Sequence, residues 1–240
     1  MTTNRLGQPI GEAVVDWMPP PRPPRAVLSG AYARLEPLDS AHHAHDLWEA
    51  YAADMDGRNW TYLAHGPYAE QSEFTAWTHA ASATLDPLFF AIADRSGRAV
   101  GVASYLRIAP EAGSIEVGHI NLSPALQRRP AATEAMYLMM AQAFALGYRR
   151  YEWKCDTLNA PSRAAAERLG FIFEGIFRQA LVYKGRNRDT AWYSIIDREW
   201  PPLQAAFERW LAADNFDAEG RQRQRLSALM VSARREIGPA

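Results

Sequence analysis

The fold is decided by the stretch Asn159–Phe171, which reads NAPSRAAAERLGF. Asparagine caps helices by accepting backbone N–H groups, proline suits the first helical turn, and glycine ends helices. The stretch therefore predicts a short helix over Pro161–Leu169 that stops at Gly170. The segments Tyr151–Cys155 and Phe171–Tyr183 are predicted as a strand before this helix and another strand after it.

Upstream of this stretch the hydrophobic pattern changes its period. A segment of strand character, Ser114–Leu122, is followed by apolar residues at helical spacing, which are Met136, Met139, Met140, Ala143 and Phe144. Gly147 then supplies a stop. The sequence thus predicts a helix over Thr133–Leu146, joined to the preceding strand through the turn Gln127–Thr133.

The remaining segments predict two hairpins and further helices. The hairpins pair Leu88–Asp94 with Ala99–Ile108, and Phe171–Tyr183 with Thr190–Ile196 around Lys184–Asp189. The other expected elements are a strand at Ala31–Pro37, a helix from Asp39 or Ser40 to about Ala53, and a helix over Ala69–Ser82. Strands and helices alternate in the middle of the chain, so the fold class is α/β or α+β.

Three parts are expected along the chain. Residues 1–30 form an N-terminal arm whose segment Met18–Arg25 (MPPPRPPR) cannot continue a helix or sheet, because proline fixes φ and lacks an N–H donor. We expect this segment to wrap the surface rather than to act as a ligand for another domain. Residues 31–200 form the body. Residues 201–240 form a helical extension that can pack on the body or on a partner, which leaves a homodimer open.

Composition excludes several classes of function. The formal net charge of −1 gives no field that would attract nucleic acid or an anionic membrane. A single cysteine, Cys155, cannot form an internal disulfide, and no apolar run resembles a membrane span or a secretory signal. We therefore expect a cytoplasmic protein. The spacing of His42, His43 and His45 does not place three ligands on one helix face, so no metal is expected.

The turn Gln127–Thr133 (QRRPAAT) is a candidate anion site. It lies between a strand and a helix start, where unpaired backbone N–H groups and the positive end of the helix dipole point outward. Arg128 and Arg129 add two charges that suit a pyrophosphate, and Ala131 and Ala132 are small enough for close approach. On these residues alone, a solvated basic turn is an equal alternative.

In the order and spacing of these parts, the segment from Ala31 to Asp197 resembles the GNAT superfamily of N-acetyltransferases. In that family a bulged strand leads to a turn of pattern Gln/Arg-x-x-Gly-x-Gly/Ala, a helix, a strand ending near an asparagine, and a short helix. The run Asn159–Phe171, together with Ala131–Ala135 (AATEA), is similar to the branch of ribosomal-protein N-terminal acetyltransferases. The resemblance implies a mixed, mostly antiparallel sheet flanked by helices, with two parting parallel strands that form a coenzyme A cleft.

The resemblance also implies which residues bind acetyl-CoA as the co-substrate. They are His119, Ile120, Asn121 and Leu122 for pantetheine, Gln127, Arg128, Arg129, Pro130, Ala131, Ala132 and Thr133 for the pyrophosphate, and Asn159, Ser162 and Arg168. Asn159 has the alternative role of a helix cap. Pro130 stands where the family prefers glycine and offers no N–H, although proline suits a first helical turn. We expect Arg128 and Arg129 to compensate.

The implied reaction is direct attack of an amine on the thioester, which requires a base, donors for the oxyanion and a donor for the thiolate. Glu116, on the strand that lines the cleft, is the candidate base, with a salt-bridged strand residue as the alternative. His119 is a weaker candidate, since three residues along an ideal strand it faces the opposite side unless a bulge turns it. Ser162 is expected to assist the thiolate or merely to cap its helix.

The acceptor is expected to be a primary amine, either a peptide α-amine or a small molecule. Side chains near the loops that would wall its site are Trp60, Tyr62, Tyr183 and Trp192, together with Glu116, although aromatic side chains more often pack in cores. A different donor such as succinyl-CoA would need a cation near the acyl end, for which Arg107 or Arg178 is available. A non-catalytic acyl-CoA-binding module is the other alternative, and Pro130 mildly favours it.

Overall fold

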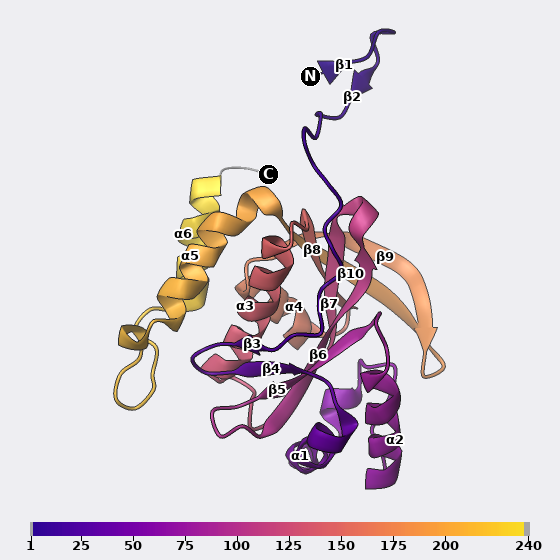
Figure 1. Ribbon diagram of the computed structural model, residues 1–240, viewed down its shortest axis with the longest axis vertical. Helices are drawn as coiled ribbons and strands as arrows, with labels where there is room; N and C mark the ends of the chain where they lie inside the picture. The colour runs from indigo at the N-terminus through magenta and orange to yellow at the C-terminus, as the bar shows by residue number, and fades with distance from the viewer. Residues whose placement is uncertain (1, 238–240) are drawn as a thin grey trace.

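One eight-stranded sheet forms the centre of the protein, whose computed structural model describes residues 2–237 (Figure 1). In spatial order its strands are β3 (Leu28–Ser29), β4 (Arg34–Pro37), β5 (Leu88–Ala93), β6 (Ala99–Ala109), β7 (Ser114–Leu122), β8 (Arg150–Asp156), β10 (Arg186–Ile196) and β9 (Ile172–Tyr183). Neighbouring strands run antiparallel except β7 and β8, which run parallel. The mixed, mostly antiparallel sheet predicted from the sequence is confirmed.

Helices cover both faces of this sheet: α1 (Ser40–Ala52), α2 (Gln71–Ser82), α3 (Pro130–Ala145), α4 (Ala160–Arg168), α5 (Trp200–Leu211) and α6 (Leu226–Ile237). Strand β5 contacts both layers, because its side chains alternate between them. Leu88, Phe90 and Ile92 join the core that includes α3, whereas Phe89 and Ala91 join the core that includes α1 and α2. None of the described helices is long and apolar enough to cross a membrane.

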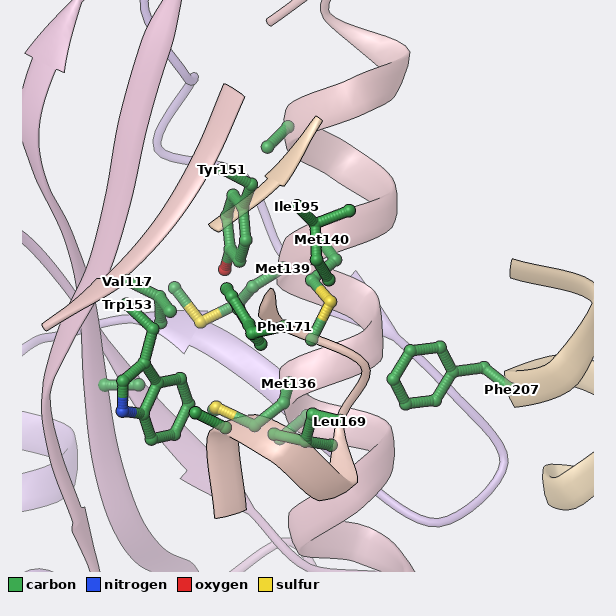
Figure 2. Packing of buried hydrophobic residues seen from close by; sticks show 14 of the residues in the cluster. Val117, Met136, Met139, Met140, Tyr151, Trp153, Leu169, Phe171, Ile195 and Phe207 are labelled. Carbon is green, nitrogen blue, oxygen red and sulfur yellow. The ribbon is translucent and has the colours of Figure 1, made fainter. Parts of the chain in front are cut away.

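The methionines of α3 build the larger core. Met136, Met139 and Met140 pack with Trp153 of β8 and with Phe171, as Figure 2 shows. Methionine is unbranched and fills irregular gaps between a helix and a sheet. This packing fixes α3 against the sheet, so that its first turn lies beside β7 and β8.

The C-terminal extension belongs to the same core. Leu203, Phe207 and Trp210 of α5 and Met230 of α6 are buried with residues of α3 and α4. Phe207 reaches toward α3 in Figure 2, and α5 and α6 lie side by side in Figure 1. The extension therefore packs on the body of its own chain.

The first residues of the N-terminal arm project away from the body in Figure 1. They form a small hairpin of β1 (Thr2–Thr3) with β2 (Pro9–Ile10). The segment Met18–Arg25 has no helix or strand, and Pro20 and Pro23 within it are buried. The proline-rich segment thus runs extended along the body.

A buried carboxylate in α3 ties the start of the body in place. Glu134 accepts the backbone N–H groups of Ala31 at 2.8 Å and of Ala33 at 2.7 Å. Gly30 is needed here, because a Cβ at that position would lie 2.3 Å from the Glu134 carboxyl carbon. The strand predicted over Ala31–Pro37 therefore begins only at Arg34, as β4, since the amides before it are bonded to Glu134.

The second hairpin is tighter than predicted. The sequence predicts a loop over Lys184–Asp189, but Tyr183 pairs with Arg186, so that only Lys184 and Gly185 turn the chain. Both residues have positive φ, 48° and 70°, as a type I′ hairpin turn requires. The polar residues after Gly185 therefore belong to β10.

Candidate active site

Strands β7 and β8 pair over only part of their length. The parallel pairing ends where Val117 faces Trp153. On its other side, β7 pairs with β6 through Gly118 with Ser104 and Asn121 with Val102. Strand β7 thus has one more residue than β6 between these two pairs, which is a β-bulge. The two strands therefore part beyond Val117, and the family's bulged strand is present where the sequence predicts it.

The bulge turns His119 toward the same cleft as Glu116. His119 has a left-handed backbone with φ of 49°. In a regular strand, residues three apart face opposite sides of the sheet. Both side chains nevertheless line one cavity, so His119 is a full candidate for chemistry in this cleft.

Two cavities adjoin where the strands part. The smaller has a volume of about 280 Å³ and polar walls that include Glu116, His119, Lys154, Asp156, Ser162 and Tyr183. The larger has a volume of about 670 Å³ and lies between β7, α3, α4 and the C-terminal extension. Ile120 and Trp153 line both cavities. A long ligand can therefore occupy the larger cavity and present one end in the smaller.

The rim of the larger cavity is basic. Arg128, Arg129 and Arg168 line it together with Pro130, the first residue of α3. Arg168 donates a hydrogen bond from Nη2 to Thr133 Oγ1 at 3.0 Å. Further inside, the walls are apolar, with Leu122, Ala132, Met136 and Leu169 among them. Such a cavity suits a ligand with an apolar arm and an anionic end.

Three residues predicted for this site lie beside the two cavities. The side chain of Gln127 donates from Nε2 to Asn59 Oδ1 at 3.0 Å and to the Leu122 carbonyl at 2.9 Å, which pins the turn to the end of β7. Asn121 is buried, and its carbonyl accepts the Tyr51 hydroxyl at 2.8 Å. Ala131 lines a neighbouring groove. None of these three residues is among those that line the two cavities.

Glu116 is held between two cations. Its Oε2 accepts from Arg107 Nη1 at 2.7 Å and lies 2.8 Å from Lys154 Nζ. Lys154 also donates to Glu152 Oε2 at 2.7 Å and lies 3.8 Å from the centre of the Trp192 ring. Glu116 itself is only 2% exposed. Two donors thus bind the carboxylate oxygen Oε2.

Ser104 holds the imidazole of His119. Its hydroxyl lies 3.2 Å from the Gly118 carbonyl and 2.9 Å from His119 Nδ1. In the tautomer protonated at Nδ1, the hydroxyl donates to the carbonyl and accepts Nδ1–H, and Nε2 is the unprotonated nitrogen. Burial, reinforced by Arg107 and Arg188, lowers the pKa of His119 to about 4. The imidazole is therefore neutral at neutral pH.

Asn159 and Ser162 meet at the start of α4, and both line the smaller cavity. Asn159 is the N-cap, and its Oδ1 accepts the Ser162 N–H at 3.1 Å. The Ser162 Oγ accepts from Trp153 Nε1 at 3.0 Å. Because this oxygen accepts, the Ser162 hydroxyl hydrogen is available to another partner.

Two of the four aromatic residues predicted for the acceptor site line the smaller cavity. Tyr62 donates its hydroxyl hydrogen to the Leu158 carbonyl at 3.0 Å. Tyr183 donates to Asp156 Oδ2 at 2.8 Å, and burial together with this contact raises the pKa of Tyr183 to about 12. Both hydroxyls are thus fixed at the wall of the cavity.

The other two aromatic residues lie elsewhere. Trp60 is buried in the core that includes α1 and α2, with its ring 5.2 Å from the ring of Tyr51 and outside the lining of the smaller cavity. A large apolar ring between two helices gains more from burial there than from a polar cleft. Trp192 lies against the ammonium group of Lys154 and is not among the residues that line the smaller cavity.

Comparison with known proteins places the chain in a family. Residues 33–172 match the family described as Acetyltransferase (GNAT) domain. The chain belongs to the GNAT acetyltransferase family. A crystal structure of a GCN5-related N-acetyltransferase from Brucella melitensis is 48% identical in sequence and superposes with a TM-score of 0.89. The match covers 91% of this chain and 100% of the Brucella melitensis chain. The predicted family is confirmed.

Two further similar proteins have descriptions that concern ribosomal proteins. A stretch of 42 residues is 45% identical to Bacillus subtilis YdaF, whose name points to a ribosomal N-acetyltransferase; it covers 18% of this chain and only 23% of YdaF. An acetyltransferase from Salmonella typhimurium, described as modifying the N-terminal serine of ribosomal protein L7/L12, is 21% identical. It covers 71% of this chain and 99% of its own with a TM-score of 0.62. The latter shares the GNAT fold.

Sequence reasoning missed two groups of lining residues in this GNAT protein. Lys154, Asp156 and Arg188 line the smaller cavity. The available signal was Lys154 in the strand YEWKC, two residues after Glu152 and hence on the same face. The second group lies in the C-terminal extension, outside the matched GNAT region, where no sequence pattern links a loop to a distant cavity.

Proposed function

We propose that this protein transfers an acetyl group from acetyl-CoA to a primary amine, with a peptide α-amine as the favoured acceptor. The observation that carries the proposal is the pair of adjoining cavities, one apolar with a basic rim and one polar. Coenzyme A has an apolar pantetheine arm between a thiol and a set of phosphates. The thiol end matches the polar cavity, the arm matches the apolar walls, and the phosphates match the basic rim. The acetyl thioester supplies the electrophilic carbonyl carbon.

On this proposal the larger cavity holds the co-substrate. Arg128, Arg129 and the first turn of α3 bind the pyrophosphate, because guanidinium groups and a helix N-terminus both favour anions. Backbone groups of His119 and Ile120 bind pantetheine, since these residues line the cavities and lie beyond the last pair of β7 with β8. Asn159 is near enough to the smaller cavity to contact the same arm while it caps α4.

His119 takes the proton from the amine in this mechanism. The amine nitrogen forms a bond to the carbonyl carbon, and its N–H then becomes far more acidic than in the free ammonium form. A neutral imidazole with a free Nε2 can accept that proton. Glu116 keeps Arg107 and Lys154 in place rather than acting as the base.

Ser162 assists the leaving group. When the C–S bond breaks, negative charge develops on the sulfur, and a hydroxyl hydrogen bond stabilises it. The Trp153 indole holds the Ser162 oxygen, which leaves the hydroxyl hydrogen for the sulfur. The proton carried by His119 finally returns to the coenzyme A thiol or to solvent.

The favoured acceptor follows from the low pKa of His119. A weak base works best on an amine that is already partly neutral at neutral pH. A peptide α-amine has an ordinary pKa of about 7.7–8.0, whereas that of a lysine side chain is about 10.4. An α-amine acceptor also agrees with the Salmonella typhimurium relative, which is described as modifying an N-terminal serine.

A succinyl donor is less favoured. Of the two cations suggested for it, Arg107 lines the smaller cavity but is bound to Glu116. Arg178 is exposed on β9 and is not among the residues that line either cavity. Neither Arg107 nor Arg178 is therefore available to bind the carboxylate at the end of a succinyl group.

A thiol-release assay with acetyl-CoA and a set of amines tests the proposal, with coenzyme A binding measured by calorimetry on the same sample. Turnover with an N-terminal peptide that exceeds turnover with an Nα-blocked lysine peptide supports it. Coenzyme A binding without turnover on any amine would favour a non-catalytic acyl-CoA-binding module.

A further inference from the structure

The loop between α5 and α6 forms one wall of the larger cavity. Trp210 at the end of α5, and Phe216, Gln222 and Arg225 in or after the loop, line the cavity opposite the first turn of α3. All four residues lie outside residues 33–172, the part of the chain that matches the family. The extension therefore adds a wall that the GNAT region alone does not provide.

This wall is fixed by a buried amide. Asn215 is fully buried, donates from Nδ2 to the Trp210 carbonyl at 2.8 Å and accepts the Gln224 N–H at 2.8 Å. The Trp210 indole donates to Gln222 Oε1 at 2.8 Å. These bonds join the two ends of the loop. The lining residues are thus held in place before any ligand arrives.

The charges of the cavity are all of one sign. Arg128, Arg129, Arg168, Arg221 and Arg225 line it, with no acidic residue among its described lining. Arg221 is engaged by Asp217 at 2.8 Å and by Glu219 at 2.9 Å. Within residues 2–237 no carboxylate pairs with Arg225, which lies just before the first residue of α6. Arg225 is therefore a cation without a counter-charge at the extension side of the cavity.

We infer that the C-terminal extension binds the nucleotide end of coenzyme A, with Arg225 on the 3′-phosphate and Phe216 against the adenine. The inference rests on the proposed function. If pantetheine points to Ile120 and Trp153 and the pyrophosphate lies at Arg128 and Arg129, the remaining end must extend toward the loop. Phe216 lines both the larger cavity and the neighbouring groove, so its ring stands where a base can pack.

Calorimetry with coenzyme A and with 3′-dephospho-coenzyme A tests this assignment, because the two ligands differ by the phosphate alone. The wild-type protein should bind coenzyme A about ten- to a hundredfold more tightly, as one charge-assisted contact allows. Arg225→Ala should lose that preference and leave the affinity for the dephospho ligand unchanged. Arg223→Ala, an exposed arginine of the same loop outside the cavity lining, is the matched control and should behave as wild type.

The outcomes separate the inference from the proposed function. If Arg225→Ala keeps the full preference for coenzyme A, or if the wild type has none, the assignment of Arg225 is wrong while the transferase proposal stands. If the wild type binds neither ligand, the proposed function fails first. A thermal melt of each variant confirms that the exposed substitutions leave the fold intact.

Discussion

The hydroxyl oxygen of Ser104 lies 2.9 Å from Nδ1 of His119, and this contact joins β6 to the bulge of β7. The same hydroxyl lies 3.2 Å from the Gly118 carbonyl, so it can donate there while its oxygen accepts Nδ1–H. The bulge therefore has two effects. It parts β7 from β8, and it presents a histidine held by Ser104 to the cleft.

Replacing His119 by asparagine tests its role as the base. Asparagine tolerates the positive φ of 49°, and its amide can donate to Ser104 in place of Nδ1–H. We expect kcat to fall about 10²- to 10⁴-fold, the usual contribution of a general base, with little change in the Kd for coenzyme A. Ser104→Ala should lower kcat less, because the base remains. Full activity in His119→Asn would assign the proton transfer to another group.

The free energy of unfolding should decrease as the pH is lowered from about 6.5 to about 4. Burial lowers the pKa of His65 and of His119 to about 4 from an ordinary 6.5. Both are neutral in the folded protein, while the unfolded chain takes up protons as pH drops through 6.5, so acid favours unfolding over this range. Urea denaturation at several pH values measures the effect. His119→Asn should show a shallower dependence; equal slopes would contradict the assigned cause.

Lys154→Met should destabilise the protein by about 3 kcal/mol, because it leaves Glu116 and Glu152 buried without their shared cation. The control is Arg98→Met, which breaks an exposed pair with Glu49 and should cost less than about 1 kcal/mol. Chemical denaturation measures both. Equal losses in the two variants would mean that the buried network contributes little.

Substitutions at Arg128 separate charge from backbone strain. Its φ of 60° is in the left-handed region, where glycine is favoured over other residues by about 1 kcal/mol. Arg128→Gly should therefore be more stable than Arg128→Ala, yet both should bind coenzyme A more weakly by about tenfold or more, since both lack the guanidinium. If the glycine variant alone kept full affinity, the strained turn rather than the charge would limit binding.

The sheet and its helices could be predicted because local patterns agree with the final packing. Leu88–Ala93 is a continuous apolar run, and it proves to be a strand buried on both faces. Pro130 suits a first helical turn, and it is the first residue of α3. The start of β4 could not be predicted in this way. It depends on Glu134, a residue about a hundred positions away that binds the preceding amides.

The candidate site was harder to predict for the same reason. The position of Glu116 on a cleft strand was correct, but the pairing with Arg107 and Lys154 comes from neighbouring strands and changes what the carboxylate can do. His119 depended on a bulge that regular strand geometry does not contain. Trp60 carries no local signal that distinguishes a cleft wall from a core, and the packing of α1 and α2 decided its place.

The most direct test of the proposed transferase activity is mass spectrometry of a peptide with a free N-terminal serine after incubation with the protein and acetyl-CoA. We expect one acetyl group on the α-nitrogen, one equivalent of free coenzyme A, and strong loss of product with His119→Asn. An unmodified peptide, together with unmodified members of a broad amine set and intact acetyl-CoA, would contradict the proposal.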